Sequence, residues 1–270
     1  MKLSIVVSTQ PASFSALAYK GKITENIIKI KNYGFDGVEL AVRDPKLLDI
    51  FGLQTVLAKA NLPVSAIGTG QAYGEEKLSF TNPDEAMRRQ AIERIQSQVQ
   101  LAEQFQTIVI LGLIRGKVEV GINKNRALEL LISAIRDCAT VNKNIKLVIE
   151  PINRYETDLV NTVIEGMDLL DKVKLENVGL LLDTFHMNIE EADMCESIYV
   201  AKDRLFHFHV ADSNRRYPGA GHINFMQILE TLEKITFRGF ISAEILPLPD
   251  SDTAAQKTKE NMSRLIGKNS

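Results

Sequence analysis

The chain has 270 residues, of which 45% are apolar and 24% charged, a composition typical of a folded globular protein. Its formal net charge of −2 gives no general attraction to nucleic acid or to anionic lipid, so we expect neither partner. No apolar run approaches the ~18 residues that a membrane span needs, and the first apolar stretch is too short for a signal peptide. Cys138 and Cys195 lack CxxC spacing and predict free thiols. We therefore expect a cytoplasmic protein.

Eight short apolar runs recur along the chain, and a longer amphipathic segment follows each of them. Near-continuous apolarity predicts strands that are buried on both faces, as parallel strands are. The runs span residues 3–9, 37–42, 63–69, 107–114, 146–151, 179–185, 205–212 and 240–246.

Helix signals lie between these runs. Asn82-Pro83-Asp84 predicts the start of a helix that continues to residue 105, and Asn161-Thr162 opens another over 163–173. Gly34 and Asn142 are expected near the ends of two more.

This alternation predicts a (β/α)₈ TIM barrel, a fold of ~250 residues, formed as a single domain over residues 1–270. No linker, repeat or low-complexity segment suggests a domain boundary. A doubly wound open sheet is the alternative. It would usually carry a glycine fingerprint after the first strand, and residues 8–17 (STQPASFSAL) have none.

Acidic or histidine side chains lie late in four consecutive apolar runs: Glu150, Asp183, His209 and Glu244. In a barrel the C-terminal ends of the strands meet at the face that carries the chemistry. One buried acid alone could be a satisfied core residue. Three carboxylates facing one another without a cation would repel strongly or share protons, so four converging side chains predict a divalent metal site.

The predicted ligands are one nitrogen and three oxygens. This set suits Mn²⁺ or Mg²⁺, with Co²⁺ as a further candidate, and the lack of a thiolate argues against structural zinc. His207 shares a strand face with His209 because side chains alternate along a strand, but it lies one layer deeper. We expect His207 to support the site or the core and not to bind the metal.

Four segments carry these residues: 150–158 (EPINRYETD), 180–191 (LLLDTFHMNIEE), 206–216 (FHFHVADSNRR) and 243–244 (AE). They resemble the xylose isomerase-like sugar isomerase/epimerase family, which includes ketose 3-epimerases and hydroxypyruvate isomerase, and the resemblance spans essentially the whole chain. Within that family, residues 8–21, 39–45, 66–73 and 111–116 are similar to the 5-keto-L-gluconate epimerase branch.

The resemblance implies roles for particular residues. It implies that the four predicted ligands bind a divalent metal, often Mn²⁺, and that Glu150 and Glu244 act as acid and base on opposite faces of the substrate. It implies further that Glu156, His186 and Arg215 contact substrate oxygens, and that the protein is a homo-oligomer, either a dimer or a tetramer.

The resemblance implies an epimerase acting next to the ketone of a ketose or keto sugar acid, and the predicted site could carry out that chemistry. A C–H beside a ketone is a poor acid unless the enolate oxygen is stabilised, which a metal provides. One glutamate would remove the proton to give a cis-enediolate, and the other would return it from the opposite face and invert the carbon.

Two arginines at strand ends suggest an acidic substrate. Arg43 follows the second run and Arg115 the fourth. A guanidinium pairs with a carboxylate in a bidentate geometry, so we hypothesise that Arg115, and less directly Arg43, binds the carboxylate of a keto sugar acid. The alternative for Arg43 is a structural pair with Asp44 or Glu39.

Other functions remain open at this stage. A neutral ketose 3-epimerase or an aldose–ketose isomerase of the hydroxypyruvate type would use the same site, and the sequence barely separates them. A DNA-repair nuclease of the endonuclease IV type would need a metal cluster and a basic groove, against which four histidines and the net charge of −2 argue. A sugar sensor would not need two catalytic bases.

Overall fold

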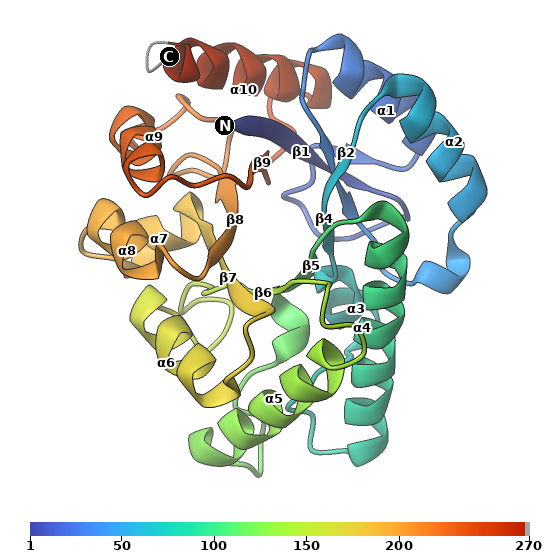
Figure 1. Cartoon of the computed structure of the whole chain (residues 1–270), viewed down its shortest axis with the longest axis vertical. Coiled ribbons are helices and arrows are strands. Elements are labelled where there is room, and N and C mark those ends of the chain that lie inside the picture. Colours follow the sequence, from blue (N-terminus) through green and yellow to red (C-terminus); the bar gives the residue numbers. More distant parts are fainter. Residues whose placement is uncertain (268–270) are drawn as a thin grey trace.

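Eight parallel strands close into a barrel, which confirms the expected (β/α)₈ fold (Figure 1). The computed structural model describes residues 1–267 of the expected domain. The strands follow chain order around the barrel, and β1 pairs with β9 to close it. Each overlaps one of the predicted runs: β1 (Lys2–Ser8), β3 (Val38–Ala41), β4 (Val64–Gly68), β5 (Val109–Leu111), β6 (Leu147–Ile149), β7 (Val178–Asp183), β8 (Leu205–Val210) and β9 (Phe240–Ala243).

A two-residue strand, β2 (Tyr19–Lys20), pairs with the end of β1, beyond the part of β1 that pairs with β9. The helices of the described chain surround the barrel (Figure 1). They are α1 (Ile23–Asn32), α2 (Ile50–Ala60), α3 (Gly70–Glu76), α4 (Glu85–Phe105), α5 (Lys124–Ala139), α6 (Val163–Val173), α7 (Thr184–Glu190), α8 (Met194–Ala201), α9 (Phe225–Lys234) and α10 (Ser251–Ile266), with the 3₁₀ turns η1 (Pro45–Leu47) and η2 (Leu113–Arg115).

Side chains at the predicted helix starts satisfy free backbone N–H groups. The Asp84 carboxylate accepts a hydrogen bond from the N–H of Ala86 at the start of α4. Thr162 and Glu165 form a reciprocal capping box at the start of α6. These local bonds fix where each helix begins and therefore which residues remain in the loops at the barrel rim.

Alternation along the strands divides the buried residues into an outer and an inner set. Val109, Leu147 and Leu180 belong to the main core, which extends from Leu3 to Met262. Their strand neighbours Ile110, Val148 and Leu181 form a separate small cluster with Ala66. Because successive side chains point to opposite faces, this second cluster fills the inside of the barrel. Glu150 lies two residues after Val148, and Asp183 lies two residues after Leu181. The same alternation therefore points both acids toward the interior of the barrel.

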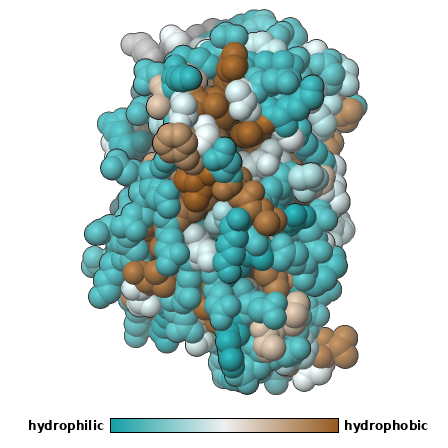
Figure 2. All heavy atoms as spheres, turned by 90° about the vertical axis from the view of Figure 1, so that its right-hand side faces the viewer, coloured by the Kyte–Doolittle hydropathy of each residue, from teal (hydrophilic) through white to brown (hydrophobic). Residues whose placement is uncertain are grey.

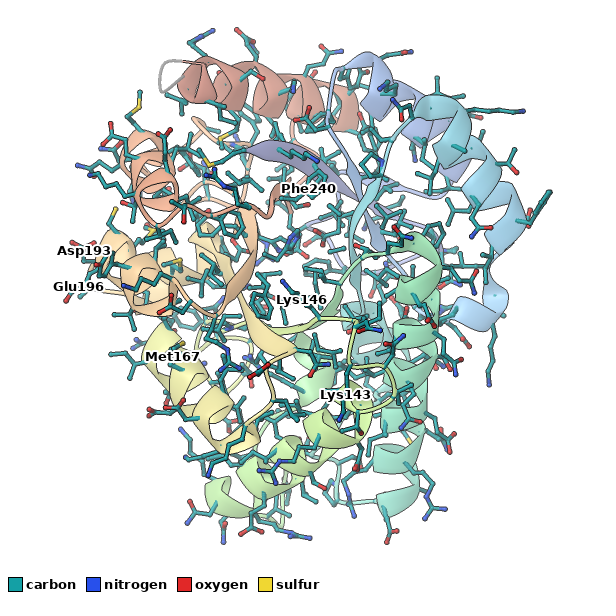
Figure 3. All side chains as sticks on the ribbon, viewed as in Figure 1. Lys143, Lys146, Met167, Asp193, Glu196 and Phe240 are labelled. Atoms are coloured by element: carbon teal, nitrogen blue, oxygen red, sulfur yellow. The ribbon has the colours of Figure 1, made fainter. Side chains whose placement is uncertain are left out.

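At the N-terminal end of the barrel, Ile108 and Phe206 pack against the inner cluster. Lys146, labelled near the middle of the ring in Figure 3, directly precedes β6, and its Nζ lies 4.3 Å from the centre of the Phe206 ring.

The face shown in Figure 2 is mostly hydrophilic, with hydrophobic side chains gathered in small groups, chiefly in its upper half. Within residues 1–267, every helix is too short or too polar to cross a membrane.

Candidate active site and metal centre

The structure brings the four predicted metal ligands together at the C-terminal end of the barrel. Glu150 directly follows β6, Asp183 ends β7, His209 lies in β8, and Glu244 directly follows β9. One ligand atom from each lies within 4.8 Å of those of the other three. Asp183 and His209 are almost completely buried, at 0% and 1% exposure. The barrel thus assembles residues that are about a hundred positions apart in sequence.

Three polar atoms of this group have no hydrogen-bond partner within the described chain. They are Glu150 Oε1, Asp183 Oδ2 and His209 Nδ1. Buried polar atoms are nearly always paired, and a carboxylate left unpaired in a protein interior is costly. Two carboxylate oxygens and one imidazole nitrogen that converge on one point become, once they lose their protons, the donor set that a divalent cation requires. The residues therefore fit the metal expected from the sequence.

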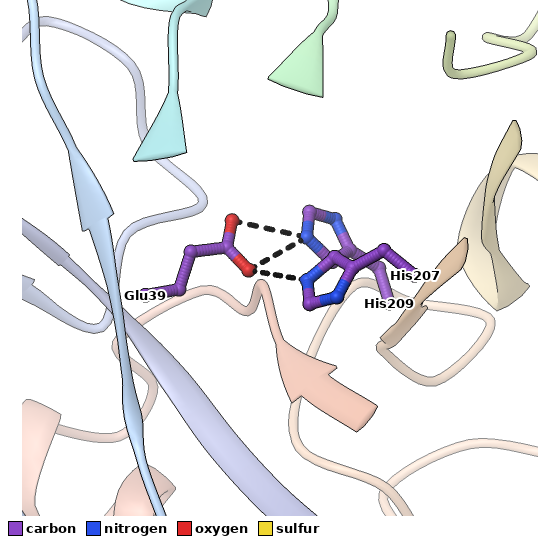
Figure 4. Close-up of side chains that lie close together, drawn as sticks. All are labelled: Glu39, His207 and His209. Atoms are coloured by element: carbon purple, nitrogen blue, oxygen red, sulfur yellow. Dashed lines mark hydrogen bonds and ion pairs between the residues drawn. The ribbon is translucent and has the colours of Figure 1, made fainter. Parts of the chain in front are cut away.

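A second group, Glu39, His207 and His209, also lies close enough to hold an ion, but its atoms already satisfy one another (Figure 4). Glu39 Oε2 is 2.8 Å from His207 Nε2, and both Glu39 oxygens are 3.1 Å from His209 Nε2. The unpaired atom of His209 is Nδ1, which lies on the side of Glu150. The first group therefore offers unpaired atoms that could hold a metal, and the second group does not.

Burial and like charge make Glu150 and Glu244 unusually basic. Burial, and then the nearby carboxylate of Glu244, raise the pKa of Glu150 to about 8. Burial also raises the pKa of Glu244, while the neighbouring guanidinium of Arg215 opposes that rise. Carboxyl groups whose pKa is raised above the usual range are suited to general acid/base work.

The surroundings of His209 favour its charged form, whereas those of Glu150 and Glu244 favour the neutral form. Burial alone would lower its pKa, but the charge of Glu39 and the hydrogen bond to it raise the pKa to about 10. The two histidines in turn hold the pKa of Glu39 well below its usual range, against the effect of burial. Glu39 and His209 therefore form a buried ion pair in the metal-free protein.

His186, on the first turn of α7, points a donor toward the metal ligands. The side-chain amide of Asn153 donates to His186 Nδ1 at 2.7 Å, so the ring proton is on Nε2. That Nε2 lies 3.8 Å from Glu150 Oε1 and 3.9 Å from Asp183 Oδ2. Burial, and then the charge of Arg215, lower the pKa of His186 well below its usual range, so the ring is neutral.

Arg215 and Glu156 complete the charged lining. Arg215 Nη2 donates to Glu244 Oε2 at 2.5 Å, and Nη1 lies 3.6 Å from Glu156 Oε1. Its guanidinium is also 4.5 Å from the centre of the Phe185 ring. The side-chain amide of Asn153, which contacts His186, also donates a hydrogen bond of 3.0 Å to Glu156.

Arg43 and Arg115, the two arginines expected to bind a substrate carboxylate, are not among the residues that line the cavity described below. Arg115 is 0% exposed and donates to the backbone carbonyl oxygens of Glu150 and Val160. The guanidinium of Arg43 pairs with Glu76 at 3.6 Å, and not with either of the acids proposed for it. Both arginines follow strands as predicted, and both are held by partners within the protein.

One cavity opens at the site, and its empty space, including its opening to solvent, is about 600 Å³. Its polar lining consists chiefly of Glu150, Glu156, His186, His209, Arg215 and Glu244. The rest of its wall is largely apolar and includes Val6, Phe14, Leu17, Ile110, Leu113 and Ile152. Phe14 and Leu17 come from the loop after β1, which carried no chemical signal in the sequence. The site thus combines one polar, acidic side with one apolar side, as small-molecule sites commonly do.

Comparisons with known proteins agree with this geometry. The family model described as "Xylose isomerase-like TIM barrel" matches residues 27–266. An L-ribulose 3-epimerase of Methylomonas sp. (strain DH-1) is 33% identical over 217 residues, which cover 78% of this chain and 74% of that protein. A 3-dehydro-D-guloside 4-epimerase of Escherichia coli (strain K12) is 26% identical over 249 residues, which cover 88% of this chain and 91% of that protein.

A solved structure extends the comparison to three dimensions. The crystal structure of D-allulose 3-epimerase from Methylomonas sp. in complex with D-allulose superimposes with a TM-score of 0.83, at 26% identity, over 98% of this chain and 96% of that one. These relatives are named as epimerases, which are isomerases. The expected fold and the expected enzyme class are therefore confirmed.

Proposed function

Because the chain belongs to the xylose isomerase-like TIM-barrel family, we propose that it is a divalent-metal-dependent epimerase that inverts a carbon next to the ketone of a ketose or keto sugar acid. The observation that carries the proposal is the convergence of Glu150, Asp183, His209 and Glu244, three of which present an unpaired buried atom to one point. Mn²⁺ is the metal we propose, with Mg²⁺ or Co²⁺ as alternatives.

Glu150 and Glu244 are the two acid/base groups of the proposal. A bound divalent ion would supply Lewis-acid stabilisation of the negative charge that develops on the ketone oxygen. One glutamate removes the proton from the carbon beside the ketone, which leaves a cis-enediolate, and the other returns a proton to the opposite face. The raised pKa of both groups supports this role, because each must hold a proton in one half of the reaction and accept one in the other.

His186 and Arg215 position the substrate oxygens in this proposal. His186 presents a neutral Nε2–H, which donates a hydrogen bond without competing for the metal site. Arg215 carries a fixed positive charge beside Glu244 and stabilises negative charge on the enediolate. The apolar side of the cavity excludes water from the carbanion face and limits unwanted protonation.

A neutral ketose fits the lining better than a keto sugar acid. Arg215, the arginine of the lining, already pairs with Glu244 and Glu156, and neither Arg43 nor Arg115 reaches the cavity. A substrate carboxylate would therefore have to compete with protein carboxylates for one cation. A keto sugar acid stays the second candidate, supported by the resemblance of several strand-end segments to the 5-keto-L-gluconate epimerase branch.

Deuterium exchange tests the proposal. The Mn²⁺-loaded protein is incubated in D₂O with fructose, tagatose, tagaturonate and 5-keto-L-gluconate, and NMR follows the label. We expect deuterium at the carbon beside the ketone together with the epimer, in the wild type and in neither Glu150→Gln nor Glu244→Gln. Label at the ketone-derived carbon with formation of an aldose would show an aldose–ketose isomerase. No exchange with any of the four sugars, combined with cleavage of abasic DNA, would favour the endonuclease alternative.

A further inference from the structure

Glu39 is a buried acid that the proposed reaction does not use. It lies on β3 at 1% exposure, and its contacts with β8 cross the interior of the barrel, because β1 and β9 lie between those two strands. Both carboxylate oxygens are 3.1 Å from His209 Nε2, and Oε2 is also 2.8 Å from His207 Nε2 (Figure 4). A single carboxylate therefore accepts hydrogen bonds from two imidazoles.

We infer that Glu39 is a positioning residue that holds one ring proton of His209 on Nε2, so that Nδ1 is the nitrogen that loses its proton and faces the metal site as a lone pair. The inference rests on the proposed function, since it concerns the ligand that His209 supplies. An ionised carboxylate only accepts hydrogen bonds, so each ring nitrogen that faces it must carry hydrogen. The other nitrogen of His209, Nδ1, has no partner and lies 3.8 Å from Glu150 Oε1.

The geometry makes the carboxylate, and not merely a polar side chain, necessary at position 39. Because both oxygens are equally close to His209 Nε2, an amide at the same place would bring its NH₂ group against that nitrogen whichever way it turned. Two donors cannot pair. The imidazole would then be driven toward the other tautomer, with hydrogen on Nδ1, where it blocks metal binding.

His207 supplies the matched control. It contacts the same carboxylate but lies deeper in the barrel, outside the cavity lining, and touches only Oε2. Glutamine in its place keeps a donor of similar reach for Glu39 and leaves the pair with His209 intact. His207→Gln therefore disturbs the same buried cluster as Glu39→Gln without reversing the proton on His209.

The test measures Mn²⁺ affinity by calorimetry in the full-length wild type, Glu39→Gln and His207→Gln proteins. Loss of a carboxylate that orients a metal-bound histidine weakens binding by about 10–100-fold, and we expect this in Glu39→Gln. We expect His207→Gln to stay within about threefold of the wild type, since an amide still satisfies Glu39. Circular dichroism confirms that each variant is folded.

A spectroscopic measurement keeps the test informative even if Glu39→Gln does not fold. In the Co²⁺-loaded wild type, His209 Nε2–H should give one paramagnetically shifted NMR signal that is lost slowly in D₂O, because the proton is buried and bonded to Glu39. His207→Gln should keep that signal, and folded Glu39→Gln should shift it or lose it rapidly.

The outcomes separate the inference from the function beneath it. A wild type that binds Mn²⁺ while Glu39→Gln binds equally well would overturn the role of Glu39 alone. Equal weakening in Glu39→Gln and His207→Gln would reduce the cluster to a structural one, and a wild-type signal that exchanges at once would do the same. A wild type that binds neither Mn²⁺ nor Co²⁺ would overturn the proposed metal site itself.

Discussion

Glu150 Oε1 and His209 Nδ1 lie 3.8 Å apart, and neither atom has a hydrogen-bond partner within the described chain. Each would accept a proton or a cation, and the burial of both residues keeps water from satisfying them. The metal-free protein therefore holds protons at positions that a metal would take. Its stability and its proton balance should both report whether the metal binds where we propose.

Glu150→Gln should stabilise the metal-free protein at alkaline pH. Burial and Glu244 raise the pKa of Glu150 to about 8. A carboxyl group whose pKa is higher in the folded than in the unfolded state gives its full stabilisation below the unfolded pKa of about 4.3 and loses it as the pH rises toward the folded value. The variant does not ionise, so in chelator its melting temperature should match that of the wild type below about pH 4 and exceed it increasingly toward about pH 9. Each kcal/mol of difference should shift the melting temperature by about 2–4 °C.

The exposed Glu103 provides the control for that comparison. Glu103→Gln should follow the wild type at every pH, because its carboxyl is in solvent. A Glu150→Gln protein that melts with the wild type across the whole range would show that Glu150 ionises freely and would contradict the buried acid cluster.

Mn²⁺ binding should release protons. Near pH 7 the metal-free protein holds protons on Glu150, with a pKa of about 8, and on His209, with a pKa of about 10. Ligand atoms must be deprotonated to bind, so we expect about one to two protons to leave for each ion bound. Calorimetry in buffers of different ionisation enthalpy gives this number directly. A binding enthalpy that does not vary between buffers would contradict the proposed ligands.

The sequence predicted the barrel and the four metal ligands for one physical reason. Apolar runs of strand length recur eight times, and a parallel barrel brings their C-terminal ends to one face. An acid late in such a run must face either the helices or the site. Glu150, Asp183 and Glu244 could therefore be selected before any contact was known.

The remaining site residues depend on contacts that the sequence does not display. Glu39 lies in the run GVELAV and meets the same criterion of an acid in an apolar run, but its partner His207 is 168 positions away. Asn153 and Phe14 lie in loops, whose conformation follows from many weak contacts. Arg115 follows its strand as predicted, yet the 3₁₀ turn η2 directs its side chain to backbone carbonyls and not to the opening.

Arg215→Met should lower catalysis without weakening metal binding. Arg215 donates to Glu244 at 2.5 Å and lies 4.0 Å from Asp183, so it competes with a bound cation for these carboxylates. Removing a preorganised charge beside the reacting oxygens should reduce kcat/KM by about 10²–10³. Mn²⁺ affinity should be unchanged or higher. Initial rates and calorimetry measure the two quantities, and Arg216→Met, at the exposed neighbouring position, should leave both at wild-type values.

If Mn²⁺ affinity fell in parallel with the rate in Arg215→Met, the guanidinium would be holding the metal ligands in place and not acting on the substrate. Loss of both quantities in Arg216→Met as well would point to a general disturbance of the loop after β8.

Arg115→Met should destabilise the protein and reduce turnover of acidic and neutral sugars equally. Arg115 is completely buried and donates to the carbonyl oxygens of Glu150 and Val160, which lie at the two ends of the loop that carries Glu156. Methionine removes one donor from each oxygen, although the Val160 oxygen keeps the N–H of Ile152. A buried oxygen left without a partner costs about 1–3 kcal/mol. Val160 also has a φ of 55°, a conformation that a β-branched residue adopts only when its surroundings hold it there. Urea unfolding should therefore show a loss of a few kcal/mol in the free energy of unfolding.

Turnover provides the second measurement. Because Glu150 would shift with its backbone, kcat/KM should fall by a similar factor for tagatose and tagaturonate. A loss confined to tagaturonate, with unchanged stability, would instead return Arg115 to the role of a carboxylate clamp.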